Sequence, residues 1–92
     1  MRRKRSKLDI IEGVLDYVAR EGGEAYATKI ATHNGLAYDR LVELLEELDS
    51  KGIVKVYATE GRRIVAITSK GYKLLKTLRD LRRAIRDFGL EL

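Results

Sequence analysis

Two groups of basic side chains are the residues of this sequence best suited to binding chemistry. One is the pair Arg62 and Arg63, which directly follows Gly61. The other is a run of cations at the N-terminus: Arg2, Arg3, Lys4 and Arg5. Such side chains bind phosphates, and an arginine can enter a minor groove of DNA, where groove width and potential favour it. We interpret both groups as candidate DNA contacts. The alternatives are solvated hairpin charges for the pair and a solubilising tail, or a remnant of the translation start sequence, for the run.

The charge of the chain is unevenly distributed around its formal net value of +5. Residues 1–7 carry five basic side chains, residues 8–69 carry seven basic and eleven acidic ones, and residues 70–92 carry seven basic and three acidic ones. The middle of the chain is therefore acidic and both ends are basic. A polyanion would meet the two ends and the pair at 62–63 rather than the whole surface.

The sequence offers little for catalysis. It contains no cysteine, which excludes disulfides, thiolate chemistry and cysteine-ligated zinc. His33 is the only histidine, has no evident nucleophile near it, and is interpreted as a helix-end residue that bonds to a carbonyl. Neither a glycine-rich phosphate loop nor a metal-ligand spacing is present. We therefore predict that the protein is not an enzyme and uses no catalytic residue, metal, cofactor or small-molecule substrate.

Length and composition predict one small domain in the cytoplasm. The 92 residues suffice for a single core. The sequence contains no run of about 18 apolar residues, so no membrane span is predicted. The basic N-terminus also lacks the apolar segment of a secretory signal. We expect a cytoplasmic, nucleoid-associated protein with no membrane partner. Charged residues make up 36% of the chain while Cys and Gln are absent, a composition that suggests a heat-adapted source.

Apolar residues at helical spacing predict helices over residues 7–20, 26–33, 38–51 and 70–88. Gly13 lies inside the first of them at a cost of roughly 1 kcal/mol relative to alanine, and close packing of another element is one reason to tolerate it. Between the third and fourth helices, two β-branched segments flank a short polar stretch that contains Gly61. This pattern predicts a β-hairpin.

The second and third predicted helices are separated by a short turn that contains Gly35. Two helices joined in this way are typical of a helix-turn-helix, although an ordinary αα-hairpin gives the same pattern. The basic hairpin that follows favours the first interpretation, because it would form a wing beside the third helix. We thus predict three divisions: a flexible basic arm over 1–7, a DNA-binding domain over 8–69 and a C-terminal helix over 70–92.

Three fragments of the sequence resemble the small archaeal winged-helix DNA-binding proteins: "SKLDIIEGVLDYV", "ATKIATHNGLAYDRLVELLEELDSKGIV" and "AITSKGYKLLKTL". The resemblance extends from about residue 4 to residue 88. It implies an α+β, mainly α fold: a winged helix-turn-helix of three helices and a two-stranded hairpin, followed by a long coiled-coil helix. It also implies a homodimer joined by the last helix, which binds double-stranded DNA as a chromatin or regulatory protein.

The third predicted helix departs from this family because its exposed positions are acidic. Five carboxylates face two cations in this helix: Asp39, Glu43, Glu46, Glu47 and Asp49 against Arg40 and Lys51. Carboxylates repel phosphates, and they read a base only by accepting from cytosine N4. We therefore expect Tyr38 and Arg40, at the N-terminal end, to be the part of this helix that meets DNA. An alternative function is a protein-interaction module that docks through the acidic face.

Three further expectations concern lysine and tyrosine side chains. Lys29 lies near the start of the second helix, where contacts to the DNA backbone are common, although it is equally well explained as a surface lysine. Tyr38 has packing over the helix turn as its alternative. The remaining tyrosines, Tyr17, Tyr26, Tyr57 and Tyr72, are expected to pack in the core or on the wing.

The last predicted helix carries the apolar repeat of a coiled coil. Its members are spaced four and three residues apart in alternation: Leu74, Leu78, Leu81, Ile85 and Phe88. We predict that they form the interface of a homodimer, in either a parallel or an antiparallel arrangement. The alternative, a helix folded back across its own domain, is expected for its first turns only. Basic residues that include Lys76 and Arg79 are expected on the opposite face, as a solvated surface or a second DNA contact.

Overall fold

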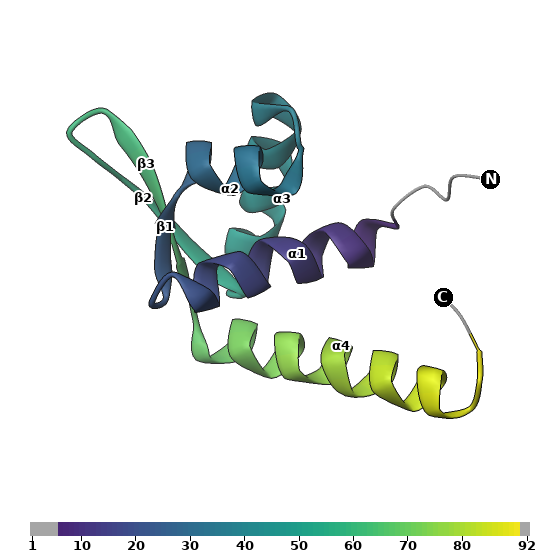
Figure 1. Cartoon of the computed structure of the whole chain (residues 1–92). Helices are drawn as coiled ribbons and strands as arrows, with labels where there is room; N and C mark the ends of the chain where they lie inside the picture. The colour runs from purple at the N-terminus through teal and green to yellow at the C-terminus, as the bar shows by residue number, and fades with distance from the viewer. Residues whose placement is uncertain (1–5, 91–92) are drawn as a thin grey trace.

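The computed structural model describes residues 6–90, which form four helices and three strands (Figure 1). In chain order they are α1 (Lys7–Arg20), β1 (Glu24–Tyr26), α2 (Ala27–Asn34), α3 (Tyr38–Ser50), β2 (Val54–Thr59), β3 (Arg62–Ile67) and α4 (Ser69–Asp87). The predicted helices are confirmed, with bounds that differ by at most one residue at either end. A reciprocal cap explains the sharp start of α1. Asp9 N–H donates to Ser6 Oγ, and Ser6 N–H donates to the Asp9 carboxylate.

The three strands form one antiparallel sheet in the order β1-β3-β2. The sequence predicted the β2–β3 hairpin but missed β1, which pairs with β3 through Glu24↔Ala66, Ala25↔Val65 and Tyr26↔Ile64. Three residues are too few to show a period of two, and the partner strand is far away in the sequence, so no local pattern indicates this strand. The wing is therefore a hairpin extended from a three-stranded sheet.

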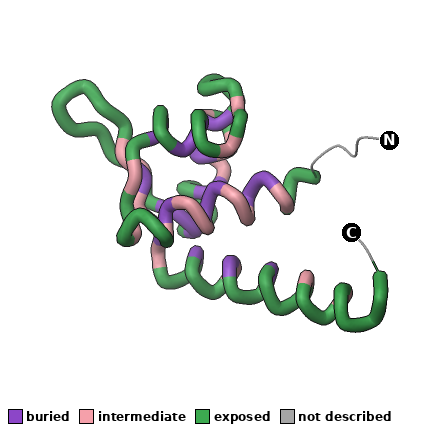
Figure 2. The backbone as a smooth tube through the Cα atoms, in the orientation of Figure 1, coloured by how far each residue is buried: buried purple, intermediate pink, exposed green. Residues whose placement is uncertain are grey.

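The helices α1, α2 and α3 cover one face of this sheet (Figure 1). Val54, Val65 and Ile67 point to that inner face and join apolar side chains from all four helices in one core. Figure 2 shows the buried segments facing the centre of the molecule, whereas the hairpin tip is exposed. The opposite, outer face of the sheet carries the alternate residues of each strand.

At the turn between α2 and α3, the Asn34 side chain packs closely on Gly13 of α1. Gly35 adopts a left-handed conformation with φ of +65°, and Leu36 N–H donates to the Ala31 carbonyl. Asn34 Nδ2 donates to the Ile30 carbonyl at 3.0 Å. Its Oδ1 lies where a Cβ on Gly13 would be, which explains the glycine inside α1. The close packing suggested for Gly13 is therefore confirmed.

The start of α4 is hydrogen-bonded to the segment that follows α3. Thr68 caps α4 by accepting from Gly71 N–H, and its hydroxyl lies within hydrogen-bond distance of the Gly52 and Ile53 carbonyl oxygens. Lys70 Nζ donates to the Lys51 carbonyl at 2.7 Å. Gly71 packs directly on the Ile53 carbonyl, in a space that leaves no room for a side chain. Two segments that are distant in the sequence are thus joined at the backbone.

The helix α4 runs antiparallel to α1, and apolar and ionic contacts join the two (Figure 1). Leu75 and Leu78 lie in the core. Beyond them, Arg79 pairs with Asp16, and Arg82 pairs with Asp9 at 2.7 Å and with Glu12 at 2.5 Å. The helix therefore packs on its own domain as far as Arg82, which is beyond the first turns for which this packing was expected.

We expect Arg82→Gln to destabilise the domain by about 1 kcal/mol near neutral pH, a value discounted because these ion pairs are partly exposed. The hydrogen bond from Arg82, together with that from Ser6 N–H, lowers the pKa of Asp9 from 3.8 to about 2. A depressed carboxyl pKa stabilises the fold above the unfolded value, and this stabilisation is lost as the pH falls through the folded value. Denaturant unfolding at several pH values should show the difference between wild type and variant shrinking between pH 3.8 and about 2. A difference independent of pH in that window would contradict the role of this pair.

Candidate nucleic-acid interface

The wing tip itself is formed by Glu60 and Gly61, and both have positive φ, 51° and 74°. Positive φ at two central residues is the geometry of a type I′ hairpin turn. Arg62 and Arg63, predicted at the tip, are instead the first two residues of β3. Because side chains alternate along a strand, the two arginines lie on opposite faces of the hairpin.

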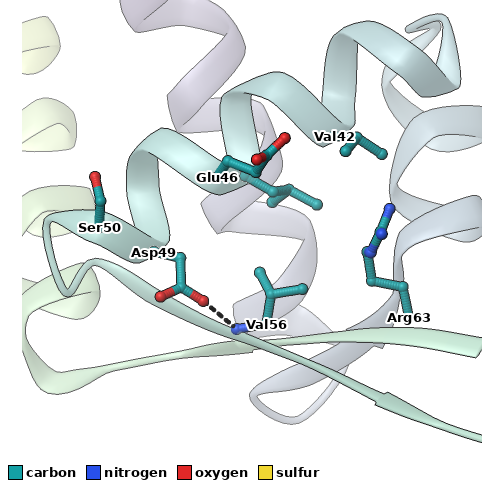
Figure 3. A pocket seen from close by; sticks show the side chains of 7 residues that line it. Val42, Glu46, Asp49, Ser50, Val56 and Arg63 are labelled. Atoms are coloured by element: carbon teal, nitrogen blue, oxygen red, sulfur yellow. Dashed lines mark hydrogen bonds between the residues drawn. The ribbon is translucent and has the colours of Figure 1, made fainter.

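Arg63 points from the inner face toward the N-terminal half of α3 (Figure 3). One of its guanidinium nitrogens donates to the Tyr38 hydroxyl at 3.4 Å, a long and therefore weak bond. Arg63 borders a groove of about 450 Å³ between α3 and the wing, with Val42, Val56 and Glu46 among its lining. The structure thus brings Tyr38 and Arg63 together, as one cation and one aromatic ring at the junction of α3 and the wing.

A hydrogen bond joins the two walls of the groove. Asp49 Oδ2 accepts from Val56 N–H at 2.8 Å and joins the C-terminal end of α3 to β2 (Figure 3). This carboxylate was predicted only as part of an acidic surface. Its structural role fixes the position of the wing relative to α3.

Arg62 lies on the outer face, where its guanidinium carbon is 5.1 Å from the centroid of the Tyr26 ring. This distance is within the range of a cation–π contact. Lys29 is exposed on α2 and lines the same hollow as Tyr26, a space of about 350 Å³. Tyr38 and Arg63 therefore lie on the inner side of the wing, whereas Arg62 lies on its outer side over Tyr26, a residue whose hollow Lys29 also borders.

The outward surface of α3 is acidic, as the sequence predicted. Leu41, Leu45 and Leu48 are buried, which leaves Asp39, Glu43 and Glu46 exposed. Glu47 is bound by Lys7 at 2.8 Å, and this hydrogen bond lowers the pKa of Glu47. Arg40 is exposed and lines a second groove with Glu43 and Lys7.

The N-terminal end of α3 has free backbone donors. Its N-cap is Ala37, whose side chain accepts no hydrogen bond, so the first N–H groups of the helix have no side-chain partner there. The candidate contacts Arg2, Arg3, Lys4 and Arg5 lie outside the described residues.

Among the tyrosines, Tyr17 is half-buried and stacks on His33, with ring centroids 4.5 Å apart. Tyr26, Tyr57 and Tyr72 are exposed and so lie outside the core. Tyr57 belongs to the wing strand β2, and Tyr26 lies under Arg62 of the wing.

The predicted interface on α4 divides into two parts. Leu78 is only 9% exposed and belongs to the core of its own chain, and Leu74 packs partly against that core. Leu81 is 49% exposed and Phe88 is 82% exposed, with the half-buried Ile85 between them. On the basic side, Lys76 pairs with Asp80 at 2.8 Å, whereas Arg79 turns toward α1 instead of away from it.

Within residues 6–90, no cluster of three or more His, Cys, Asp or Glu side chains is arranged to hold a metal ion. In the same described part of the chain, no helix combines the length and apolar character that crossing a membrane requires.

Comparison with known proteins gives one family match and several structural ones. The family model described as winged helix-turn-helix matches residues 4–86. The chain is similar to Sso10a-2, a DNA-binding protein from Sulfolobus solfataricus, with a TM-score of 0.80 and 19% identity over 91% of this chain and 85% of that one. It is also similar to MOSR, a transcriptional regulator of M. tuberculosis solved in complex with DNA. Here the TM-score is 0.73 and the identity 20%, over 85% of this chain and 57% of that one.

One curated relative matches in sequence, the phenylalanine–tRNA ligase alpha subunit of Metallosphaera sedula. The two are 36% identical over 58 residues, which is 63% of this chain and 12% of that subunit. The chain thus spans about one-eighth of the length of this relative. The structural likenesses describe the fold, since their sequence identities are low.

Proposed function

Because this chain belongs to the winged helix-turn-helix family, we propose that it is a homodimer that binds double-stranded DNA. The observation that carries the proposal is the position of Arg62 and Arg63, exposed on the two faces of a projecting hairpin. Similarity to two proteins described as DNA-binding or DNA-bound supports it. The corresponding location is the nucleoid, in a chromatin-associated or regulatory role without catalysis.

The DNA backbone is contacted by the wing and by the start of α3. Arg62 and Arg63 bind phosphates or enter a minor groove. Tyr38 and Arg40 contact the backbone beside the free N–H groups of the first turn of α3, which favour an anion. Lys29 and the arm residues Arg2, Arg3, Lys4 and Arg5 add positive charge to this contact with the DNA backbone.

Backbone contacts dominate over base reading in this proposal. A recognition helix laid in a major groove would bring Asp39, Glu43 and Glu46 close to phosphates, where their charges repel. Turning the C-terminal half of α3 away removes Glu46 from the DNA, while Asp39 and Glu43 still offset part of the charge of Arg40, so the wing arginines supply most of the attraction. Such contacts position a protein on DNA without selecting a sequence.

The dimer forms through the outer half of α4. Leu81 and Phe88 are exposed and Ile85 between them is half-buried, and the three recur at spacings of four and three residues. Burying such a side chain fully is worth roughly 1.5–3 kcal/mol. A second copy of α4 carries the same apolar stripe, so two copies can pack against each other through identical surfaces. Leu74 extends the stripe toward the domain, whereas Leu78 serves the core.

We expect the double substitution Arg62→Ala with Arg63→Ala to weaken duplex binding by about tenfold or more on every sequence. Each lost phosphate contact should also reduce the slope of log K against log salt by about 0.9. Fluorescence anisotropy with two unrelated duplexes across a salt series measures both effects. The matched control is Lys73→Ala with Arg83→Ala, which removes the same charge from the exposed surface of α4. Equal losses in both variants would assign binding to net charge and remove the wing from the proposal.

A second candidate function is a protein-interaction module. It is favoured by the exposed row of Asp39, Glu43 and Glu46 on α3, which suits a basic protein partner better than a nucleic acid. The first function requires binding to duplex DNA, whereas docking of a basic protein on α3 does not. Measuring duplex binding by the wild-type protein therefore separates the two functions.

A further inference from the structure

The outer face of the sheet is a second exposed surface, and the duplex proposal does not use all of it. The inner face packs on the helices, but the outer positions of β2 and β3 remain exposed or half-buried. One row across the sheet consists of Tyr26, Ile64 and Tyr57, because Ile64 pairs with Tyr26 on one side and with Tyr57 on the other. Two tyrosines, each 37% exposed, thus flank one aliphatic side chain.

The ring of Tyr57 leans across the sheet instead of standing upright. Its hydroxyl donates to Glu24 Oε2 at 2.7 Å, and Glu24 lies on β1. β1 and β2 are two strand spacings apart, or about 10 Å, so this bond requires the ring to extend over β3. The bond to Glu24 fixes the ring in this position and raises the pKa of Tyr57, which keeps the hydroxyl protonated. One side of the ring is left toward solvent.

The charges on this face favour an anion. Lys55 and Arg62 are its exposed cations, against the carboxylate of Glu24, which the Tyr57 hydroxyl already engages. Arg62 lies over the Tyr26 ring at 5.1 Å. The adjoining hollow of about 350 Å³ is bordered by Lys29 and by the carboxylates of Glu21 and Glu24, so it adds no positive charge. An exposed aromatic ring that shares one sheet face with the cations Lys55 and Arg62 matches one chemistry well: a base stacks on the ring while its phosphates bind the cations. A duplex cannot use such a ring, because its bases are stacked on each other.

We infer that the outer sheet face binds single-stranded DNA, with a base stacked on Tyr57 and the backbone held by Arg62 and Lys55. The choice of DNA rests on the proposed duplex function. This face lies on the same hairpin as the wing, so a strand separated from a duplex at the wing would meet Tyr57 without leaving the protein. Stacking of this kind is tolerant of sequence.

The test measures anisotropy of labelled oligothymidylate, dT12, and of a duplex in parallel at about 50 mM salt. Tyr57→Leu should weaken dT12 binding by about 5- to 150-fold, the usual effect of removing one stacked base, and should leave duplex binding unchanged. Tyr57→Phe keeps the ring but loses the bond to Glu24, so it should weaken dT12 binding less than Tyr57→Leu does. Arg62→Ala should weaken dT12 binding, whereas Arg63→Ala, with the same charge on the inner face, should not.

A readout that needs no variant is the upfield shift of the Tyr57 ring protons when dT12 is added to the wild-type protein. Absence of that shift, or dT12 affinity unchanged by Tyr57→Leu, would overturn the inference even if duplex binding is strong. Binding of oligouridylate U12 tenfold tighter than dT12 would overturn the assignment to DNA. If the wild-type protein binds dT12 but does not bind the duplex, the result would instead count against the proposed function.

Discussion

Replacing Leu81 and Phe88 together with lysine should convert the protein to monomers and weaken duplex binding by about a hundredfold or more. Both side chains are exposed on the outer half of α4, so the substitutions leave the core of the domain intact. Linking two binding modules raises avidity by 10²–10⁴ without any new contact, and this gain is lost when the modules separate. The two lysines add positive charge, which by itself would strengthen attraction to DNA. A loss of affinity would therefore report the loss of the dimer.

Light scattering gives the mass of each variant, and anisotropy gives its affinity. The control is Leu81→Met with Phe88→Leu, which keeps the stripe apolar and should remain dimeric. Leu78 is unsuitable for this test because it lies in the core, where a lysine would unfold the domain. A Leu81→Lys, Phe88→Lys protein that stays dimeric would place the interface elsewhere.

Gly71→Ala should lower the free energy of unfolding by about 3 kcal/mol, which is at the upper end of the usual cost of overpacking. Its Cβ would overlap the Ile53 carbonyl and the Ile67 side chain. The carbonyl is backbone, and it cannot move without weakening its bonds with Thr68 N–H and the Thr68 hydroxyl. Because 1 kcal/mol shifts the midpoint of a domain of this size by about 4–8 °C, the thermal midpoint should fall by roughly 12 °C or more.

Gly13→Ala is the matched control, since both glycines lie inside helices. Its Cβ would meet only the Asn34 side chain, whose end can rotate, and the gain in helix propensity offsets about 1 kcal/mol. We expect a change of about 1 kcal/mol or less for this variant. If Gly71→Ala melts at the temperature of the wild type by circular dichroism, the close contact between α4 and the end of α3 is not tight.

The sequence predicted most of the fold because its signals are local. The cap at Ser6, the stop at Gly35 and the apolar spacing of α3 each act within a few residues, and the family match confirms the winged helix-turn-helix resemblance. Non-local features were missed. The strand β1 exists only through its pairing with β3, and the need for glycine at Gly71 depends on the Ile53 carbonyl.

The contact of α4 with α1 was a missed signal that the sequence does contain. Asp9, Glu12 and Asp16 recur at helical spacing on α1, and Arg79 and Arg82 recur likewise on α4. Opposite charges on two such stripes attract each other, which favours packing of the two helices side by side. The apolar repeat of α4 was interpreted as one seam for a partner, whereas Leu75, Leu78 and Arg82 form an adjacent face for its own domain.

The candidate site was predicted in its residue types but not in its geometry. Side chains alternate along a strand, so Arg62 and Arg63 lie on opposite faces once β3 is known to begin at Arg62. Without that starting residue, the two arginines were predicted together at the tip. The proximity of Arg63 to Tyr38 depends on the angle between the wing and α3, which the bond from Val56 N–H to Asp49 fixes. No spacing in the sequence encodes that angle.

The salt dependence of duplex binding by the wild-type protein is the most direct test of the proposed grip on the DNA backbone. Two wings that each engage two phosphates predict a plot of log K against log salt with a slope of about −3.5 or steeper. A flat plot, or no retention of duplex at about 50 mM salt, would contradict duplex binding and favour the protein-interaction function of α3.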